Sequence, residues 1–307
     1  MAGDGKTSIW WNGKLVPWAD AKVHVLSHAL HYGTGVFEGI RAYRTPKGIA
    51  IFRLKEHIDR FFYSAKVYKI AMPVTWKDVF EGCREVVRAN ALEECYLRPL
   101  AFLGHGPLGV YPKNVPTEVV VAAYPWGAYL GPEALEKGIR ATISSWTRIH
   151  LSSFPTQAKG TGTYLNSSLA VKDAREKGFE EAILLDRHGE VAEGSGENIF
   201  VVAKGRLVTP GIASSILPGI TRDSVMTIAA DLGIPCDVRS VGRSELYGAD
   251  ELFFTGTAAE VTPIREVDGY VIGEGRRGPI TERIQSAYFD AVRGKNDAKS
   301  AWLTHVQ

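Results

Sequence analysis

The chain has 307 residues, of which 45% are hydrophobic and 23% charged, with a formal net charge of +2. This composition is typical of a globular protein with room for two domains, and the balanced charge gives no indication of a nucleic-acid partner. No stretch approaches the roughly 20 apolar residues of a membrane span, and the first residues lack the apolar segment of a signal peptide. We therefore expect a cytoplasmic protein without nucleic-acid or membrane partners.

The N-terminal part of the sequence contains clear strand and helix patterns. Asn12-Gly13 lies between apolar residues and predicts a β-hairpin, because both residues accept positive φ angles. Apolar residues at helical spacing predict helices over 54–70 and 76–90. Runs rich in β-branched and aromatic residues predict strands over 95–104 and 117–126, joined by a Gly/Pro-rich loop over 104–114.

The C-terminal part mixes strands and helices without a regular order. The sequence predicts a helix over about 165–177, strands over 181–186 and 198–203 with a hairpin turn at 204–205, a helix opening near Thr221, strands over 251–256 and 270–273, and a terminal helix from Pro279. A doubly wound parallel sheet requires regular alternation. We therefore expect a mixed α+β and α/β fold: a small N-terminal domain over 1–124, an interdomain loop over 125–136 and a large cofactor-binding domain over 137–307, with largely antiparallel sheets.

Four familiar sites are disfavoured by spacing. The segment GDGKTS lacks the earlier glycine of a phosphate-binding loop, and GTGVFEG over 33–39 is not spaced as a dinucleotide fingerprint. Ser195 lacks the glycine two positions earlier that a nucleophile elbow requires. His28 and His31 have no third ligand at metal-binding spacing, and the cysteines at 83, 95 and 236 are widely spaced. We expect no metal site, and structural thiols.

A lysine, a helix start and a glutamate together match the needs of pyridoxal phosphate. Lys159 lies between small residues and could form the Schiff base with the cofactor aldehyde. The helix opening at Ile220 and Thr221 could bind the phosphate through its free backbone N–H groups, and Glu193 could pair with the ring nitrogen. Taken singly, Lys159 and Glu193 are more typical of a solvated loop lysine and a surface glutamate, and the helix start is as typical of an ordinary capped helix, so only their combination favours the cofactor.

The order of the motifs identifies a family resemblance that covers nearly the whole chain. The segments LHYGTGVFEGIRAY, YLRPL, QAKGTGTYLNS, EGSGENIF, LPGITRDS and FFTGTAAEVTPI follow one another as in the fold-type IV, or class IV, aminotransferases. Their combination resembles the branched-chain amino-acid aminotransferases in particular. The resemblance implies a transaminase that uses pyridoxal 5′-phosphate.

The cofactor-binding residues implied by this resemblance come from the whole length of the chain. The motif lysine falls on Lys159, the tyrosine that bonds the cofactor phenolate on Tyr164, and the glutamate that pairs with the ring nitrogen on Glu193. The remaining positions, which surround the phosphate and the ring, are Arg60, Leu217, Gly219, Ile220, Thr221 and Thr257.

The resemblance also implies one pocket for two kinds of substrate. The positions implied for substrate binding are Tyr32, Phe37, Gly39, Tyr96, Arg98, Val110, Trp126, Tyr129, Thr257 and Ala258, with Tyr164 beside them. Aromatic residues suit the side chains of Leu, Ile and Val, while Arg98 can bind the second carboxylate of glutamate. These features imply ping-pong transfer between L-branched-chain amino acids and 2-oxoglutarate, with Lys159 as general acid and base.

Family members form homodimers in which the loop over 104–114, with Val110, reaches the neighbouring site, and bacterial members often form hexamers. One departure is Thr163, where family members commonly have asparagine before the tyrosine.

Three other interpretations stay open: a D-amino-acid transaminase, a lyase that cleaves aminodeoxychorismate, and a non-enzymatic binding protein, with or without the cofactor. The first two would retain Lys159 and Glu193.

Overall fold

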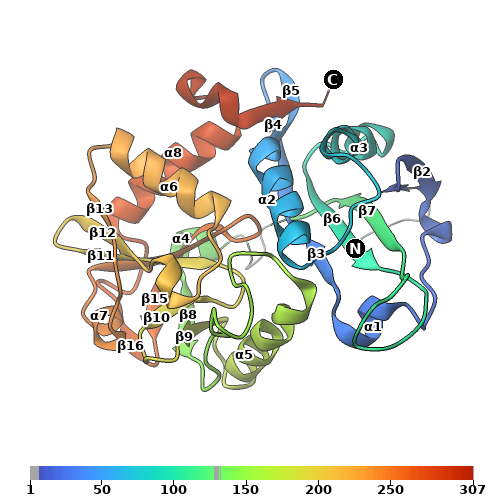
Figure 1. Ribbon diagram of the computed structural model, residues 1–307. Helices are drawn as coiled ribbons and strands as arrows, with labels where there is room; N and C mark the ends of the chain where they lie inside the picture. Colours follow the sequence, from blue (N-terminus) through green and yellow to red (C-terminus); the bar gives the residue numbers. More distant parts are fainter. Residues whose placement is uncertain (1–6, 128–130, 132, 307) are drawn as a thin grey trace. The chain divides into compact units, whose positions relative to one another are not determined.

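The computed structural model describes residues 7–127, 131 and 133–306. The chain forms two compact units, each with its own sheet (Figure 1). The first unit comprises residues 1–126, 158–163 and 291–307, and the second comprises 127–157 and 164–290. These units are not continuous in sequence, whereas the domains expected above were. The short segment that contains Lys159 belongs to the first unit, and the chain returns to that unit at its C-terminus.

The first unit is built on an eight-stranded sheet in which every recorded strand pair is antiparallel. The strand order is β17-β5-β4-β6-β7-β1-β2, and β3 pairs with β6. Its strands are β1 (Ser8–Trp11), β2 (Lys14–Pro17), β3 (Gly35–Phe37), β4 (Ile40–Thr45), β5 (Gly48–Phe52), β6 (Cys95–Leu103), β7 (Thr117–Tyr124) and β17 (Leu303–His305). Its helices are α1 (His28–Tyr32), α2 (Leu54–Val67) and α3 (Trp76–Ala89), with 3₁₀ turns η1 (Trp18–Asp20), η2 (Thr161–Thr163) and η4 (Asp297–Trp302).

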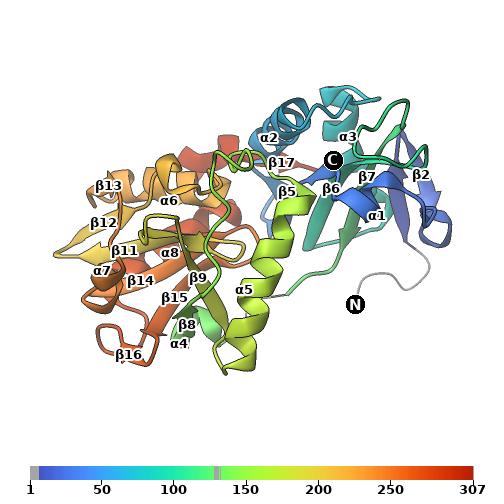
Figure 2. The ribbon, with the colours of Figure 1, turned by 60° about the horizontal axis from the view of Figure 1, so that its bottom comes forward.

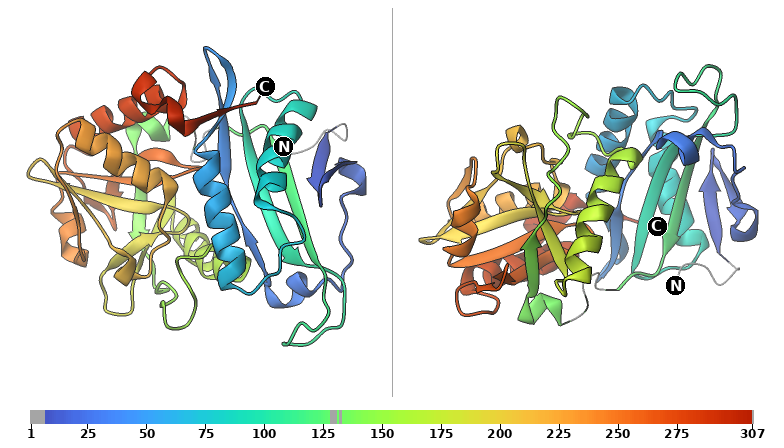
Figure 3. Two further views of the ribbon diagram at one scale, coloured as in Figure 1. Left: turned by 45° about the horizontal axis from the view of Figure 1, so that its top comes forward. Right: turned by 90° about the horizontal axis from the view of Figure 1, so that it is seen from below.

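The local signals explain how the elements of this unit form. The β1–β2 turn places Asn12 and Gly13 at φ 45° and 93°, which confirms the predicted hairpin. Helix α2 buries Leu54, Ile58 and Phe61 along one face, as helical periodicity predicts. Helix α3 begins at a capping box between Thr75 and Asp78. Both helices pack together on the sheet, as Figure 3 shows, and enclose the apolar core of the unit.

The second unit is built on a nine-stranded sheet of order β10-β9-β8-β15-β14-β11-β12-β13, with β16 paired to β15. Its strands are β8 (Ile139–Ile143), β9 (Glu181–Leu185), β10 (Val191–Gly194), β11 (Asn198–Ala203), β12 (Arg206–Thr209), β13 (Cys236–Val238), β14 (Glu251–Gly256), β15 (Glu260–Val267) and β16 (Tyr270–Val271). Its helices are α4 (Ala134–Lys137), α5 (Tyr164–Glu176), α6 (Ile220–Asp231), α7 (Arg243–Tyr247) and α8 (Pro279–Val292), which runs two residues into the first unit, and η3 (Ile212–Ser214) is a 3₁₀ turn.

Parallel and antiparallel pairs are mixed in this second sheet. Strand β8 is parallel to both β9 and β15, and β12 is parallel to β13, while the other pairs are antiparallel. Helix α5 packs against β9 (Figure 2), and α6 packs against β14. The mixed fold with largely antiparallel sheets is therefore confirmed. Across the described residues, no helix has the length and apolar character needed to cross a membrane.

Candidate functional site

The backbone of Lys159 is fixed from two sides within the first unit. The Phe37 amide donates a hydrogen bond to the Lys159 carbonyl oxygen at 3.1 Å, next to an antiparallel bridge between Val36 and Gly160. From the other side, the Lys159 amide donates to the hydroxyl oxygen of Ser64 in α2 at 2.9 Å. The opening segment of the lysine motif is therefore held between strand β3 and helix α2.

The side chains of Lys159 and Arg98 both approach the ring of Phe37. The Lys159 Nζ atom lies 5.0 Å from the ring centroid, and the guanidinium carbon of Arg98 lies 4.8 Å from it. Phe37 is buried, so these cation–π contacts are partly shielded from water. The structure thus brings together three residues that the sequence analysis assigned to the lysine and substrate positions.

Tyr96 extends this group along β6. The Arg98 guanidinium donates to the Tyr96 hydroxyl at 3.3 Å, and the Tyr96 ring lies 5.1 Å from the Trp126 ring, centroid to centroid. A Cβ atom on Gly39 would lie 1.8 Å from the Tyr96 hydroxyl oxygen, so only glycine fits at that position. Five of the residues predicted to bind substrate therefore form one aromatic and cationic cluster: Phe37, Gly39, Tyr96, Arg98 and Trp126.

Arg60, which the family resemblance assigned to the phosphate, forms a tight ion pair with Glu38. Its Nε and Nη2 atoms donate to the two carboxylate oxygens of Glu38 at 2.7 and 2.9 Å. His57, one turn earlier in α2, contacts the same carboxylate through Nδ1 at 2.7 Å. Glu38 is fully buried, and pairing with a guanidinium is what makes a buried carboxylate tolerable.

The surroundings of this cluster shift two pKa values. Burial by itself raises the pKa of Glu38, but the charge and hydrogen bonds of Arg60, together with those of His57, hold that pKa far below its usual range. Burial lowers the pKa of His57; Glu38 opposes that shift, while the cations of Arg60 and Lys159 add to it. His57 is therefore a neutral ring that donates to an ionised Glu38 near pH 7.

Tyr32 and the residue before Val110, Gly109, both contact a different residue, His28. The Tyr32 and His28 rings are 4.5 Å apart, and His28 Nε2 donates to the carbonyl oxygen of Gly109 at 2.8 Å. Thr34 contacts the other ring nitrogen at 2.8 Å, so buried His28 ties the 104–114 loop to α1. Val110 is 88% exposed. The sequence prediction of a satisfied polar histidine at position 28 matches this geometry.

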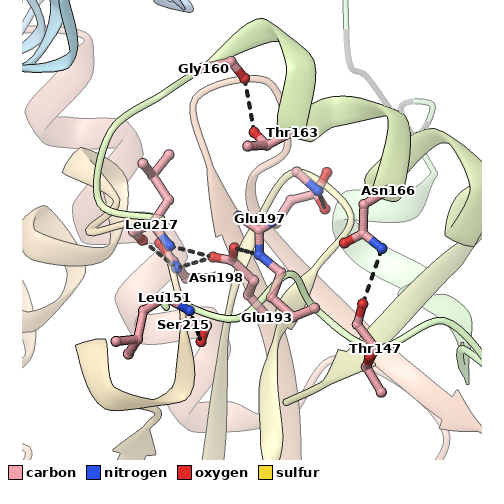
Figure 4. A network of polar contacts seen from close by, with 12 residues as sticks. Thr147, Leu151, Gly160, Thr163, Asn166, Glu193, Glu197, Asn198, Ser215 and Leu217 are labelled. Atoms are coloured by element: carbon pink, nitrogen blue, oxygen red, sulfur yellow. Dashed lines mark hydrogen bonds and ion pairs between the residues drawn. The ribbon is translucent and has the colours of Figure 1, made fainter. Parts of the chain in front are cut away.

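In the second unit, Glu193 is the centre of a buried polar network (Figure 4). Its carboxylate pairs with Arg148 Nε at 2.7 Å and accepts hydrogen bonds from the Asn198 side chain and the Leu217 amide, each at 3.0 Å. The Asn198 side chain also donates to the Leu217 carbonyl oxygen at 2.9 Å. Asn198 therefore connects the glutamate to the segment that precedes α6.

The remaining predicted cofactor residues of this unit lie at the ends of its elements. Helix α6 begins at Ile220 and has Gly219 as its N-cap, so the N-cap residue has no side chain to bond the amides of the first turn. Thr221 is buried in that turn. Thr257 and Ala258 form the turn between β14 and β15. Such amide-rich positions can bind an anion.

The residues after the lysine motif are placed in part. Tyr164 is the first residue of α5, in the second unit. Thr163, the departure from the family pattern, still forms a hydrogen bond, since its hydroxyl donates to the Gly160 carbonyl oxygen at 2.9 Å. Tyr129, predicted to bind substrate, lies outside the described residues.

Five residues of these clusters were not found from the sequence: Glu38, His57, Ser64, Arg148 and Asn198. Glu38 and Asn198 lie inside two of the family motifs, so the motifs themselves could have indicated that these residues belong to the site. Arg148 and Ser64 carry no such signal, because they lie in a loop and on a helix face and meet their partners only through tertiary packing.

Comparison with known proteins matches this geometry to one family. The model of the amino-transferase class IV family matches residues 35–267. The chain belongs to the class IV aminotransferases. It is 51% identical over 299 residues to the branched-chain-amino-acid aminotransferase of Escherichia coli K12, and the aligned region covers 97% of each chain.

Two solved structures of a class IV relative from T.th. have nearly the same fold. The branched-chain amino acid aminotransferase with pyridoxamine 5′-phosphate has a TM-score of 0.96 and 51% identity, and all of both chains is covered. The same enzyme complexed with N-(5′-phosphopyridoxyl)-L-glutamate has a TM-score of 0.94 and 51% identity, covering 98% of this chain and 99% of that one. The family predicted from the motif order is therefore confirmed.

Proposed function

We propose that the protein is a pyridoxal-phosphate-dependent transaminase that moves the amino group between the L-branched-chain amino acids Leu, Ile and Val and 2-oxoglutarate. The observation that carries this proposal is the approach of an amine, Lys159, and a guanidinium, Arg98, to the same buried aromatic ring of Phe37. A transaminase with two unlike substrates requires a reactive amine beside a pocket that is both apolar and cationic. Identity with the branched-chain enzymes at about half of all positions supports the same conclusion.

The residues present fit the cofactor. The T.th. relative binds pyridoxamine 5′-phosphate in one structure and a phosphopyridoxyl-glutamate in another. In this chain, a lysine with an anchored backbone, a buried carboxylate with two hydrogen-bond donors and an arginine ion pair, and a helix start without a capping side chain match the aldehyde, ring nitrogen and phosphate of pyridoxal phosphate. When bound, the cofactor supplies an aldehyde for covalent attachment and a ring that withdraws electrons from the substrate.

These contacts support the roles that we propose for the residues of the chain. Glu193, held in place by Arg148 and Asn198, keeps a proton on the ring nitrogen, because a buried carboxylate stabilises a neighbouring cation. Arg60 in the first unit and the first turn of α6 in the second would each supply donors to the phosphate. Tyr164 would donate to the phenolate oxygen, and Leu217 would pack on the ring. With the cofactor bound, Lys159 would remove the proton from the substrate Cα and return it to the cofactor carbon.

Substrate selection uses the cluster around Phe37. Phe37, Tyr96 and Trp126 provide the apolar surface for a branched side chain. Arg98 binds the distal carboxylate of glutamate or 2-oxoglutarate through its planar donor edge. Gly39 leaves room for the Tyr96 hydroxyl, which with the Thr257 and Ala258 amides binds the α-carboxylate. The proposal also includes Tyr32, Val110, whose loop is expected to reach the site of the neighbouring chain, and Tyr129, which lies outside the described residues.

The proposal includes assembly and location. Apolar side chains are exposed on α1, on the segment before it and on the 104–114 loop of the first unit. They are Val25, Leu30, Val110 and Tyr111, whose exposed fractions range from 62 to 88%. Side chains of this kind gather at contacts between chains, so we take a homodimer as the minimal active unit, with a hexamer as its larger form. Light scattering of the purified protein tests this. We also propose a cytoplasmic location, tested by cell fractionation.

The activity is tested by a screen of amino donors with 2-oxoglutarate. We expect L-leucine, L-isoleucine and L-valine to give glutamate when the protein is loaded with pyridoxal phosphate. The Lys159→Ala variant is expected to lose turnover and the visible absorbance of the lysine-bound cofactor. Transfer from D-alanine with none from L-leucine would indicate the D-amino-acid enzyme instead, and cofactor binding without turnover would indicate a binding protein.

A further inference from the structure

Ser64 lies at the point where helix α2 meets the lysine segment. Its side chain is fully buried, and its hydroxyl oxygen accepts the hydrogen bond of the Lys159 amide at 2.9 Å. The two residues are 95 positions apart in sequence. The opposite side of the Lys159 peptide is held by a backbone donor, the Phe37 amide. Of these two anchors, only Ser64 is a side chain that a substitution can remove.

The same face of α2 carries the predicted phosphate ligand. Arg60 and Ser64 are four residues apart and therefore lie on one face of the helix, separated by roughly 6 Å along its axis. Tyr68, a further turn along, lies so close to Gly160 that a Cβ atom there would be 2.6 Å from its ring. One face of α2 and its C-cap thus carry Arg60, the acceptor of the Lys159 amide and the ring that packs on Gly160.

We propose that Ser64 is a positioning residue for Lys159, which fixes the distance between the lysine backbone and the phosphate-binding Arg60. This inference rests on the proposed function, because it assigns Lys159 to the cofactor aldehyde and Arg60 to its phosphate. The distance between these two groups is set by the cofactor, so the protein needs a rigid element that holds both partners. Helix α2 provides that element, and the Ser64 hydroxyl is its attachment to the lysine segment.

The proposal predicts a specific effect of Ser64→Ala. The Lys159 amide loses the Ser64 acceptor, while the Lys159 carbonyl oxygen keeps the hydrogen bond from the Phe37 amide of β3. Because a displacement of about 1 Å can reduce turnover by about 100-fold, we expect kcat to fall between about 10- and 100-fold. Ser64 is not a member of the substrate cluster around Phe37 and Arg98, so KM for L-leucine stays within about twofold. The rate constant of hydrogen exchange at the Lys159 amide, read from the peptide that contains it, is expected to rise by about tenfold or more.

Two further variants separate hydrogen bonding from packing. Ser64→Cys keeps the approximate volume but has sulfur, a weak acceptor, so it is expected to behave like Ser64→Ala. Thr45→Val removes another buried hydroxyl of the first unit, which donates to the Gly48 carbonyl oxygen, and it is expected to leave kcat within about twofold of the parent.

The measurements are steady-state kinetics with L-leucine and hydrogen–deuterium exchange of the holoenzyme, with thermal unfolding as a check on folding. Parent-like kcat in Ser64→Ala, parent-like values in Ser64→Cys, or unchanged exchange at Lys159 would each overturn the proposal. Failure of the parent enzyme to transaminate L-leucine would instead overturn the proposed function, while the exchange measurement would still decide whether Ser64 anchors Lys159.

Discussion

Glu38 accepts hydrogen bonds from two nitrogens of Arg60, at 2.7 and 2.9 Å, while fully buried in the first unit. The pair joins strand and helix, because Glu38 lies between β3 and β4 and Arg60 lies in α2. His57 completes the set of donors at 2.7 Å. The position of a predicted phosphate ligand therefore depends on a carboxylate that the cofactor itself need not touch.

Glu38→Gln is predicted to destabilise the protein strongly. The amide has nearly the same shape but no charge, so the partly buried Arg60 guanidinium loses its counter-ion. We expect the free energy of unfolding at pH 7 to fall by roughly 3–5 kcal/mol, as for other buried pairs that lose one partner. Urea unfolding followed by circular dichroism measures this change.

The matched control is Glu93→Gln, which removes the partner of Arg44 in an exposed ion pair. Its effect on the free energy of unfolding should stay below about 1 kcal/mol. Similar losses in the two variants would show that the burial of Glu38 is unimportant.

The lowered pKa of His57 predicts a dependence of stability on pH. The unfolded chain binds a proton at His57 below about pH 6.5, whereas the folded chain keeps the ring neutral to lower pH. The stabilising contribution is therefore complete above about pH 6.5 and is lost as the pH falls toward the folded pKa. The slope is at most about 1.4 kcal/mol per pH unit for one group.

Comparison with His57→Gln isolates this contribution. Between pH 7 and pH 5, the free energy of unfolding of the parent protein should fall more steeply than that of the variant. Urea unfolding at a series of pH values measures both curves, and parallel curves would rule out a contribution from His57.

Arg98→Ala is predicted to affect the two half-reactions unequally. Loss of hydrogen bonds to a charged carboxylate, worth about 1.5–3 kcal/mol, should slow the half-reaction with glutamate by roughly 10- to 100-fold. The half-reaction with leucine, which has no second carboxylate, should change by less than about threefold. Single-turnover measurements of the cofactor absorbance distinguish the two, with exposed Arg44→Ala as the control. Equal losses would assign Arg98 a different role.

Gly160→Ala is predicted to strain the lysine segment. The added Cβ atom would lie 2.6 Å from the Tyr68 ring and hydroxyl, and overpacking of this kind costs about 1–3 kcal/mol in unfolding free energy. Truncation of the ring should relieve this strain. Gly160→Ala should therefore cost less unfolding free energy in the Tyr68→Ala background than in the parent protein. Gly196→Ala, where the added atom meets open space, should be nearly neutral in thermal unfolding. Additive effects at 160 and 68 would contradict the steric explanation.

Local patterns were sufficient for the elements with strong periodicity or strong turn chemistry. The Asn12-Gly13 hairpin and the starts of α2 and α3 agree with the expectations, because turn residues, caps and amphipathic spacing act within a few residues. The short strands β3 and β10 have no such pattern. They are buried throughout and lie in motifs rich in glycine, so periodicity could not identify them.

By itself, the sequence determined the family and the identity of the expected lysine, glutamate and arginine, because motifs keep their order and residue types along the chain. Only the tertiary structure decided which groups hold those residues in place. Ser64 meets Lys159, and Arg148 meets Glu193, through contacts between segments far apart in sequence. A buried polar group needs a hydrogen-bond partner, and tertiary packing determines which residue lies close enough to be one. Local sequence patterns therefore do not predict these pairs.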